Sequence, residues 1–193
     1  MSAPLQLRFL ASATRTSQLP ESPAEVAFVG RSNVGKSSLI NALANQKQLA
    51  RVSNTPGRTQ LINIFGHDGG GTLVDLPGYG YAKVPGRVRK DWQQMIEGYL
   101  LERDSLEMVF VLVDGEIGPT PLDVQMLDWL RENGVPHTVV ATKTDKVRSS
   151  HRQRRKRELA DGCRLEPGDV VSVSVTNGAG LDQLRALVRA HLI

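Results

Sequence analysis

The chain has 193 residues, of which 40% are hydrophobic and 23% charged, and its net charge is +4. These values are typical of one soluble globular domain that can bury a real core, and the mild positive charge permits contact with RNA without requiring it. The single cysteine, Cys163, excludes an internal disulfide, and no apolar run approaches the roughly 20 residues of a membrane helix. Residues 1–19 hold no long apolar segment typical of secretory signals, so we expect a cytoplasmic protein without membrane contact. As a separate expectation, we expect the protein to be a monomer.

Apolar periodicity predicts strands and helices that alternate along the chain. The expected strands cover 5–10, 25–29, 61–65, 72–76, 109–113, 137–141 and 170–173. The expected helices follow the loop at 30–37 and cover 89–102, 121–133, 150–160 and the residues from 181 onward. The glycine-rich segment 66–71 predicts a turn, so the strands on either side of it should form a hairpin.

This alternation predicts an α/β fold in three layers, with a mostly parallel sheet, one antiparallel edge strand and helices on both faces. The Pro-containing connector at 20–23 divides the chain into an N-terminal extension, residues 1–23, and a main domain, residues 24–193. We expect the extension to pack on the domain and its strand at 5–10 to add an edge strand. Ligands of such folds bind where the carboxyl ends of the strands meet the loops, and the motifs below all lie at such places.

A phosphate-binding loop follows the strand at 25–29. Gly30, Gly35, Lys36 and Ser37 meet the spacing G-x-x-x-x-G-K-S. Small residues let the backbone N–H groups point at phosphate oxygens, Lys36 adds positive charge near the β- and γ-phosphates, and the Ser37 hydroxyl can ligate Mg²⁺. A chance match in a Gly-rich turn is the alternative, but the position between a predicted strand and a predicted helix favours the phosphate loop.

A second motif, residues 75–78, ends the strand at 72–76. Asp75 can hold a water molecule on Mg²⁺, and the Gly78 N–H can approach a γ-phosphate. The pattern D-x-x-G alone is common in ordinary turns, so its position downstream of the phosphate loop gives it weight. In the loop before the strand at 61–65, Thr59 rather than Thr55 is the candidate that completes the Mg²⁺ shell when a γ-phosphate is present.

The tetrapeptide 142–145 predicts which base is bound. Asp145 can accept both N–H donors on one edge of guanine, whereas adenine presents an acceptor there. The Lys143 stem can lie over the base plane. The alternative is an ordinary T-x-x-D helix cap. Downstream, the Val175 N–H is a candidate donor to the guanine carbonyl, on a weaker pattern.

Four segments, in this order, carry a resemblance that covers the chain from about Phe9 to its C-terminus. They are GRSNVGKSSLINAL, TPGRTQLINIF, DLPGYGYAKVP and TKTDK. The chain resembles the YihA/EngB family of bacterial GTPases, within the Ras-like P-loop NTPases. The resemblance implies GTP and GDP binding with Mg²⁺, GTP hydrolysis, a role in assembly of the large ribosomal subunit with contact to its precursor and rRNA, and a link with cell division and septation.

The resemblance also assigns roles to residues. It implies catalytic roles for Lys36, Thr59 and Gly78, and metal ligation by Ser37 and Thr59, with Asp75 acting through water. It implies nucleotide contacts by Gly30, Arg31, Ser32, Asn33, Val34, Gly35, Lys36, Ser37, Ser38, Gly57, Arg58, Thr59, Gln60, Leu61, Asp75, Leu76, Pro77, Gly78, Thr142, Lys143, Thr144, Asp145, Val173, Ser174 and Val175.

Three positions modify these expectations. Tyr79 stands where many Ras-like enzymes have a water-orienting Gln, so we predict slow hydrolysis by the isolated protein. Thr142 stands where Asn is commoner, so we expect some loss of nucleotide affinity. Asn33 suggests that K⁺ beside the phosphates supplies positive charge, as in related bacterial GTPases with Asn at this position.

Two basic segments have open interpretations. The run at 151–157 is either a solvated helix face or a contact with rRNA phosphates. A second cluster follows Gly78 and consists of Lys83, Arg87, Arg89 and Lys90. In this position, the bound nucleotide could control whether the cluster is exposed to a partner. A guanine-nucleotide adaptor without turnover is the rival function. A third possible function, a P-loop kinase, would not account for the presence of Asp145 and Thr59.

Overall fold

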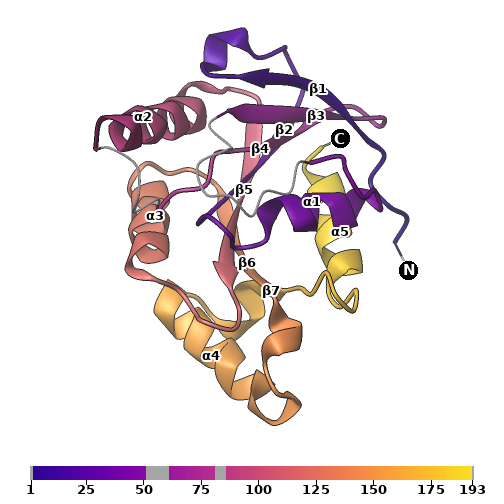
Figure 1. Cartoon of the computed structure of the whole chain (residues 1–193), viewed down its shortest axis with the longest axis vertical. Coiled ribbons are helices and arrows are strands. Elements are labelled where there is room, and N and C mark those ends of the chain that lie inside the picture. Colours follow the sequence, from indigo (N-terminus) through magenta and orange to yellow (C-terminus); the bar gives the residue numbers. More distant parts are fainter. Residues whose placement is uncertain (1, 51–60, 81–85, 193) are drawn as a thin grey trace.

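A computed structural model describes residues 2–50, 61–80 and 86–192, without the side chains of 86–89, 91 and 92. Its strands form one sheet, whose order is β1-β3-β4-β2-β5-β6-β7 (Figure 1). The strands are β1 (Leu7–Ala13), β2 (Glu25–Gly30), β3 (Ile62–His67), β4 (Thr72–Asp75), β5 (Leu106–Asp114), β6 (His137–Thr142) and β7 (Val170–Ser172). The helices are α1 (Lys36–Ala44), α2 (Gly86–Glu102), α3 (Pro121–Glu132), α4 (Arg152–Cys163) and α5 (Leu181–Ala190).

The expected α/β fold class is confirmed. Strands β4, β2, β5, β6 and β7 are mutually parallel, and β3 runs antiparallel to both of its neighbours, β4 and β1. The expected hairpin is therefore present as β3 and β4. The N-terminal strand β1 covers the outer side of β3, so the edge of the sheet comes from the extension.

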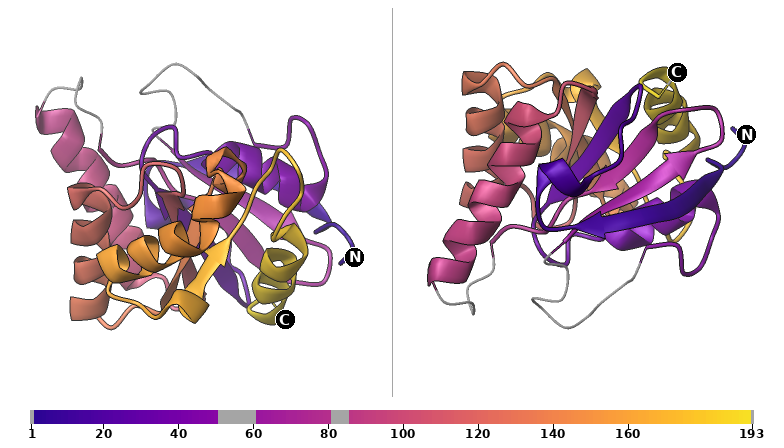
Figure 2. Two further views of the ribbon diagram at one scale, coloured as in Figure 1. Left: turned by 90° about the horizontal axis from the view of Figure 1, so that it is seen from below. Right: turned by 90° about the horizontal axis from the view of Figure 1, so that it is seen from above.

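Helices cover both faces of the sheet, as expected (Figure 2). On one face, α2, α3 and α4 contribute Ile96, Leu127 and Leu159 to one buried cluster. On the other face, α1 and α5 contribute Leu39 and Leu184 to a second cluster. Successive residues of β5 join the two clusters in turn, because side chains of a strand alternate between faces. This explains the continuous apolar run in that strand.

Most predicted boundaries agree with the structure within three residues. Helix α3 begins at Pro121 as expected, and its capping box pairs Thr120 with Asp123. The basic helix α4 begins later than predicted, after a 3-10 turn at Ser149–His151, and continues to Cys163. Among the described residues, no helix is long and apolar enough to cross a membrane.

The N-terminal segment before β1 is joined to the rest of the fold through α1 and α5. Leu5 is fully buried, and its N–H donates to the Leu43 carbonyl at 2.9 Å. The Arg189 guanidinium on α5 donates to the Ser2 hydroxyl at 2.6 Å and to the Ala3 and Pro4 carbonyls. The segment is thus held by both apolar burial and hydrogen bonds.

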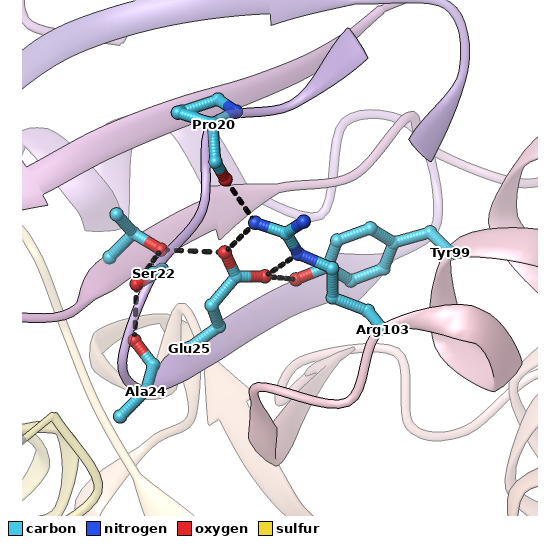
Figure 3. A network of polar contacts seen from close by, with 7 residues as sticks. Pro20, Ser22, Ala24, Glu25, Tyr99 and Arg103 are labelled. Carbon is cyan, nitrogen blue, oxygen red and sulfur yellow. Dashed lines mark hydrogen bonds and ion pairs between the residues drawn. The ribbon is translucent and has the colours of Figure 1, made fainter. Parts of the chain in front are cut away.

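A buried carboxylate at the start of β2 organises the end of the sheet away from the phosphate loop (Figure 3). Glu25 accepts hydrogen bonds from Arg103 (2.7 and 2.9 Å), Tyr99 (2.8 Å) and Thr72 (3.0 Å). Arg103 also donates to the Pro20 carbonyl. A buried charge requires such partners, so this network ties the end of α2, strands β2 and β4, and the connector together.

Candidate functional site

The carboxyl ends of β2, β4, β6 and β7 lead into the loops that carry the predicted site residues. These strands are parallel neighbours or are separated only by β5, so their loops lie along one edge of the sheet. Segments that are far apart in sequence are thereby brought together. Hydrogen bonds between the loops, described below, join them into one site.

The phosphate loop connects β2 to α1. A Cβ at Gly30 would lie 3.0 Å from atoms of Leu112 and Val34, so the first glycine permits close packing at the end of β2. Asn33 and Gly35 have φ angles of 64° and 101°, in the left-handed region that glycine and asparagine tolerate best. Helix α1 begins at Lys36, which places its N-terminus at the loop, where backbone N–H groups and the helix dipole favour anions.

Lys36 and Asp75 form an ion pair at the base of this loop. The Lys36 Nζ contacts Asp75 Oδ1, and the two residues are only 8% and 2% exposed. Burial lowers the pKa of Lys36 to about 7, while the adjacent carboxylate favours the charged ammonium. Ser37, one residue further along α1, is half-buried, as is Ser38. The Lys36 ammonium and the Asp75 carboxylate thus meet beside the helix N-terminus, and Ser37 is the next residue of α1.

The segment after β4 is attached directly to the phosphate loop. The Tyr79 N–H donates to the Gly30 carbonyl at 3.2 Å, and the Ser32 N–H donates to the Tyr79 carbonyl at 3.1 Å. A Cβ at Gly78 would lie 3.1 to 3.2 Å from atoms of Ser32, so the glycine permits this approach. Leu76 and Pro77, which precede it, are buried. The Gly78 peptide is therefore placed at the phosphate loop.

The loop after β6 is also bonded to the phosphate loop. The Thr142 hydroxyl donates to the Val34 carbonyl at 2.7 Å, and Lys143 Nζ donates to the Asn33 carbonyl at 2.9 Å. Lys143 Cε lies 3.9 Å from a Cβ built on Gly35, so its stem runs beside the loop. Thr142, at the position where asparagine is commoner, therefore makes a hydrogen bond between these two loops.

Asp145 is held by the loop after β7. Its Oδ1 accepts a hydrogen bond from the Ser174 hydroxyl at 2.7 Å, and this bond is the main cause that lowers the pKa of Asp145. Ser174 is fully buried, whereas Val175 is 43% exposed. Thr144 donates to the Val173 carbonyl at 3.0 Å. Asp145 itself is half-buried and ionised at neutral pH, with lone pairs left to accept further donors.

Part of the predicted site lies outside the described residues. This applies to Gly57, Arg58, Thr59 and Gln60. Leu61, directly before β3, is 37% exposed. In the second basic cluster, Lys83 and the side chains of Arg87 and Arg89 are likewise outside the described part, and Lys90 is exposed. Among the described residues, no group of three or more His, Cys, Asp or Glu side chains could hold a metal ion.

Two buried polar residues that anchor loops, Asp114 and Asn41, were not among the predicted site residues. Asp114, 3% exposed at the end of β5, accepts a hydrogen bond from Lys143 Nζ at 2.7 Å. Burial would raise the pKa of Asp114, but hydrogen bonds from Lys143 and two backbone N–H groups lower it. Asn41 on α1 is 6% exposed and bonds both the N–H and the carbonyl of Ala50, at 2.7 and 2.9 Å. A polar residue at the end of an apolar strand was the available signal for Asp114.

The fold and the joined loops define a Ras-like P-loop GTPase. A family model described as "50S ribosome-binding GTPase" matches residues 25–143. A "Probable GTP-binding protein EngB" of Citrifermentans bemidjiense is 47% identical over 188 residues, which cover 97% of this chain and 88% of that protein. One of Pelotomaculum thermopropionicum is 55% identical over 145 residues, which cover 75% and 73% of the two chains.

Comparison with solved structures agrees with the sequence comparisons. The crystal structure of a probable GTP-binding protein EngB has a TM-score of 0.72 at 25% identity, and the match covers 88% of this chain and 98% of that one. Aquifex aeolicus Era bound to GDP and AlF4⁻ has a TM-score of 0.69 at 23% identity over 90% and 58% of the two chains, a likeness in fold. The chain belongs to the EngB family of GTP-binding proteins, which are GTPases.

Proposed function

We propose that this protein binds GTP with Mg²⁺, hydrolyses it slowly by itself, and uses the GTP and GDP states in assembly of the large ribosomal subunit. The observation that carries the proposal is that hydrogen bonds join three loops into one site. These loops bring together Lys36 at the start of α1, Gly78 after β4 and Asp145 after β6. The ribosomal partner is supported by the family description and by the basic surface of α4.

In this proposal the phosphate loop, residues 30–38, holds the phosphates through its N–H groups and Lys36. The donor set fits Mg²⁺, which prefers oxygen ligands and keeps several waters: the Ser37 hydroxyl lies at the start of α1, and the Asp75 carboxylate is close to Lys36. By resemblance to the family, Thr59 would be a further ligand, and Gly57, Arg58, Gln60 and Leu61 would contact the nucleotide. Bound Mg²⁺ would neutralise charge on the β- and γ-phosphates.

Guanine recognition falls to Asp145, with Lys143 along the base and Thr142 and Thr144 holding the loop. Ser174 orients the Asp145 carboxylate at 2.7 Å. The exposed Val175 offers its backbone N–H to the guanine carbonyl. Val173, two residues earlier, is a further proposed contact of the base. Adenine would place a lone pair against the carboxylate, which selects against ATP.

Turnover by the isolated protein should be slow, because the Tyr79 hydroxyl is engaged with Asp123 at 2.7 Å and offers no amide to orient water. We expect rates far below one per second alone, and faster phosphate release when large ribosomal subunits are added. Multiple-turnover phosphate release, with small subunits as the control, measures this. Turnover at tens per second without a partner would contradict slow hydrolysis, and GTP binding without turnover in either case would favour the adaptor.

The surface proposed to contact rRNA is α4 with the turn before it. Arg148, His151, Arg152, Arg154 and Arg157 are exposed there. Glu158 pairs with Arg154 at 2.7 Å and Arg155 at 3.2 Å, so part of this charge is already neutralised. In Figure 1 this helix lies at the opposite end of the molecule from β1.

Exchanging Arg148, Arg152 and Arg157 for Gln should weaken binding to large-subunit rRNA and lower the slope of log K against log salt by about 2 to 3 units if all three contact phosphates. The matched control exchanges Arg8, Arg15 and Lys47, which are equally exposed and carry the same charge, for Gln. Filter binding over a salt series measures both. Equal losses from the two triple variants would assign α4 to the solvated-face interpretation.

A monovalent cation is the proposed source of positive charge during hydrolysis. Asn33 is exposed on the phosphate loop, where its side chain can face the phosphates. We expect GTPase rates on the order of 100-fold higher in KCl than in NaCl, the lower end of the range for one charge-stabilising group. Asn33→Gly, which suits the φ of 64°, should remove the difference. Equal rates in the two salts for the unmodified protein would exclude this role of K⁺.

By likeness to the same family, we propose a link with cell division and septation, a cytoplasmic location and a monomeric state. We also propose that residues 24–193 form the G domain and that residues 1–23 are an extension packed on it. The burial of Leu5 and the pairing of β1 with β3 support this division.

A further inference from the structure

Tyr79 connects the phosphate loop to helix α3. Its main chain is bonded to Gly30 and Ser32, while its hydroxyl donates to Asp123 Oδ1 at 2.7 Å. The ring packs against the buried cluster on the α2, α3 and α4 side of the sheet. Burial and the adjacent Asp123 carboxylate raise the pKa of Tyr79, so the hydroxyl keeps its proton and acts as the donor.

Asp123 is itself fixed. It is 2% exposed, and its Oδ2 accepts hydrogen bonds from the Thr120 N–H at 2.8 Å and the Thr120 hydroxyl at 2.7 Å. These bonds form the capping box of α3. The Tyr79 hydroxyl therefore donates to a carboxylate whose position is fixed, because the first turn of α3 holds that carboxylate.

The Gly78 peptide lies directly before this link. Gly78 approaches Ser32 so closely that a Cβ would lie 3.1 Å from the Ser32 hydroxyl oxygen. After Tyr79, Gly80 has a φ of 81°, and a Cβ there would lie 2.9 Å from Leu122 on α3. Gly78 is thus bounded by the phosphate loop on one side and by a side chain anchored on α3 on the other.

We propose that Tyr79 is a positioning residue whose hydrogen bond to Asp123 holds the Gly78 N–H in place for the γ-phosphate and so sets the preference for GTP over GDP. This inference rests on the proposed contact of Gly78 with the γ-phosphate. GDP has no γ-phosphate, so a loosened Gly78 peptide weakens GTP binding and leaves GDP binding unchanged. A group that is held in place before it binds costs less to order than a mobile one.

The test uses Tyr79→Phe, which keeps the ring and removes only the hydroxyl. We expect its affinity for a non-hydrolysable GTP analogue with Mg²⁺ to fall about three- to tenfold, the range for one hydrogen bond, while GDP affinity changes less than twofold. Fluorescent-nucleotide titrations give both constants. Asp123→Asn should stay close to the unmodified protein, because the amide oxygen can accept from Thr120 while the amide NH₂ donates to the Tyr79 oxygen.

Tyr99→Phe is the matched control, because Tyr99 also donates from a buried hydroxyl to a buried carboxylate, Glu25, in the same apolar cluster. It should lower the melting temperature without changing the ratio of GTP-analogue to GDP affinity. An unchanged ratio in Tyr79→Phe, or equal losses for both nucleotides, would overturn the inference. Failure of the unmodified protein to bind either nucleotide would instead refute the proposed function.

Discussion

Asp145→Asn should lower the affinity for GTP by a factor on the order of 100 or more and create binding of xanthosine triphosphate. The carboxylate accepts two guanine N–H donors in our proposal, and an amide would place its own NH₂ against one of them. Xanthine has an oxygen at that position, which the amide can serve as donor. Competition of xanthosine and guanosine nucleotides for a fluorescent probe measures the exchange.

The control for this variant is Asp104→Asn, the same chemical change at an exposed carboxylate two residues after the end of α2. It should leave both affinities unchanged. Ser174→Ala provides a graded comparison, because it removes the hydrogen bond to Asp145 at 2.7 Å and leaves the carboxylate in place. GTP affinity in Asp145→Asn within threefold of the unmodified protein would show that Asp145 does not select the base.

Lys36→Ala should abolish measurable GTP turnover and weaken binding of both GTP and GDP by roughly 100-fold, about 3 kcal/mol, the upper range for a hydrogen bond to a charged group. Lys36 is 8% exposed and its burial lowers its pKa to about 7, so phosphates would stabilise its charged form at neutral pH. Isothermal titration and phosphate release measure the two losses.

Loss of the Lys36–Asp75 ion pair should also lower the stability of the fold. Lys36→Ala leaves Asp75, 2% exposed, without its ammonium, so the variant should also unfold at lower temperature, because an unpaired buried charge is costly. Lys47→Ala removes the same charge from an exposed residue after α1 and should change neither binding nor melting temperature. Binding of both nucleotides by Lys36→Ala at unmodified strength would exclude Lys36 as a phosphate ligand.

The sequence alone predicted the fold class, the order of the strands and helices along the chain, and the candidate motifs. The reason is that phosphate and guanine chemistry impose narrow requirements on local residues, as at Gly30 and Gly35, where backbone approach and a φ of 101° are needed. Apolar alternation around these motifs was strong enough to predict β2, β5 and α3 within a few residues.

Long-range partners decided the rest. Nothing near Thr142 in the sequence indicates that its hydroxyl reaches the Val34 carbonyl, 108 residues away, or that Lys143 bridges Asn33 and Asp114. The direction of the Tyr79 side chain likewise follows from packing against α3 rather than from local pattern. The sequence thus determined which chemical groups lie at the ends of the strands. Only the tertiary structure decided which of these groups form hydrogen bonds with one another, because the packing of the parallel strands side by side brings loops together that are far apart in the sequence.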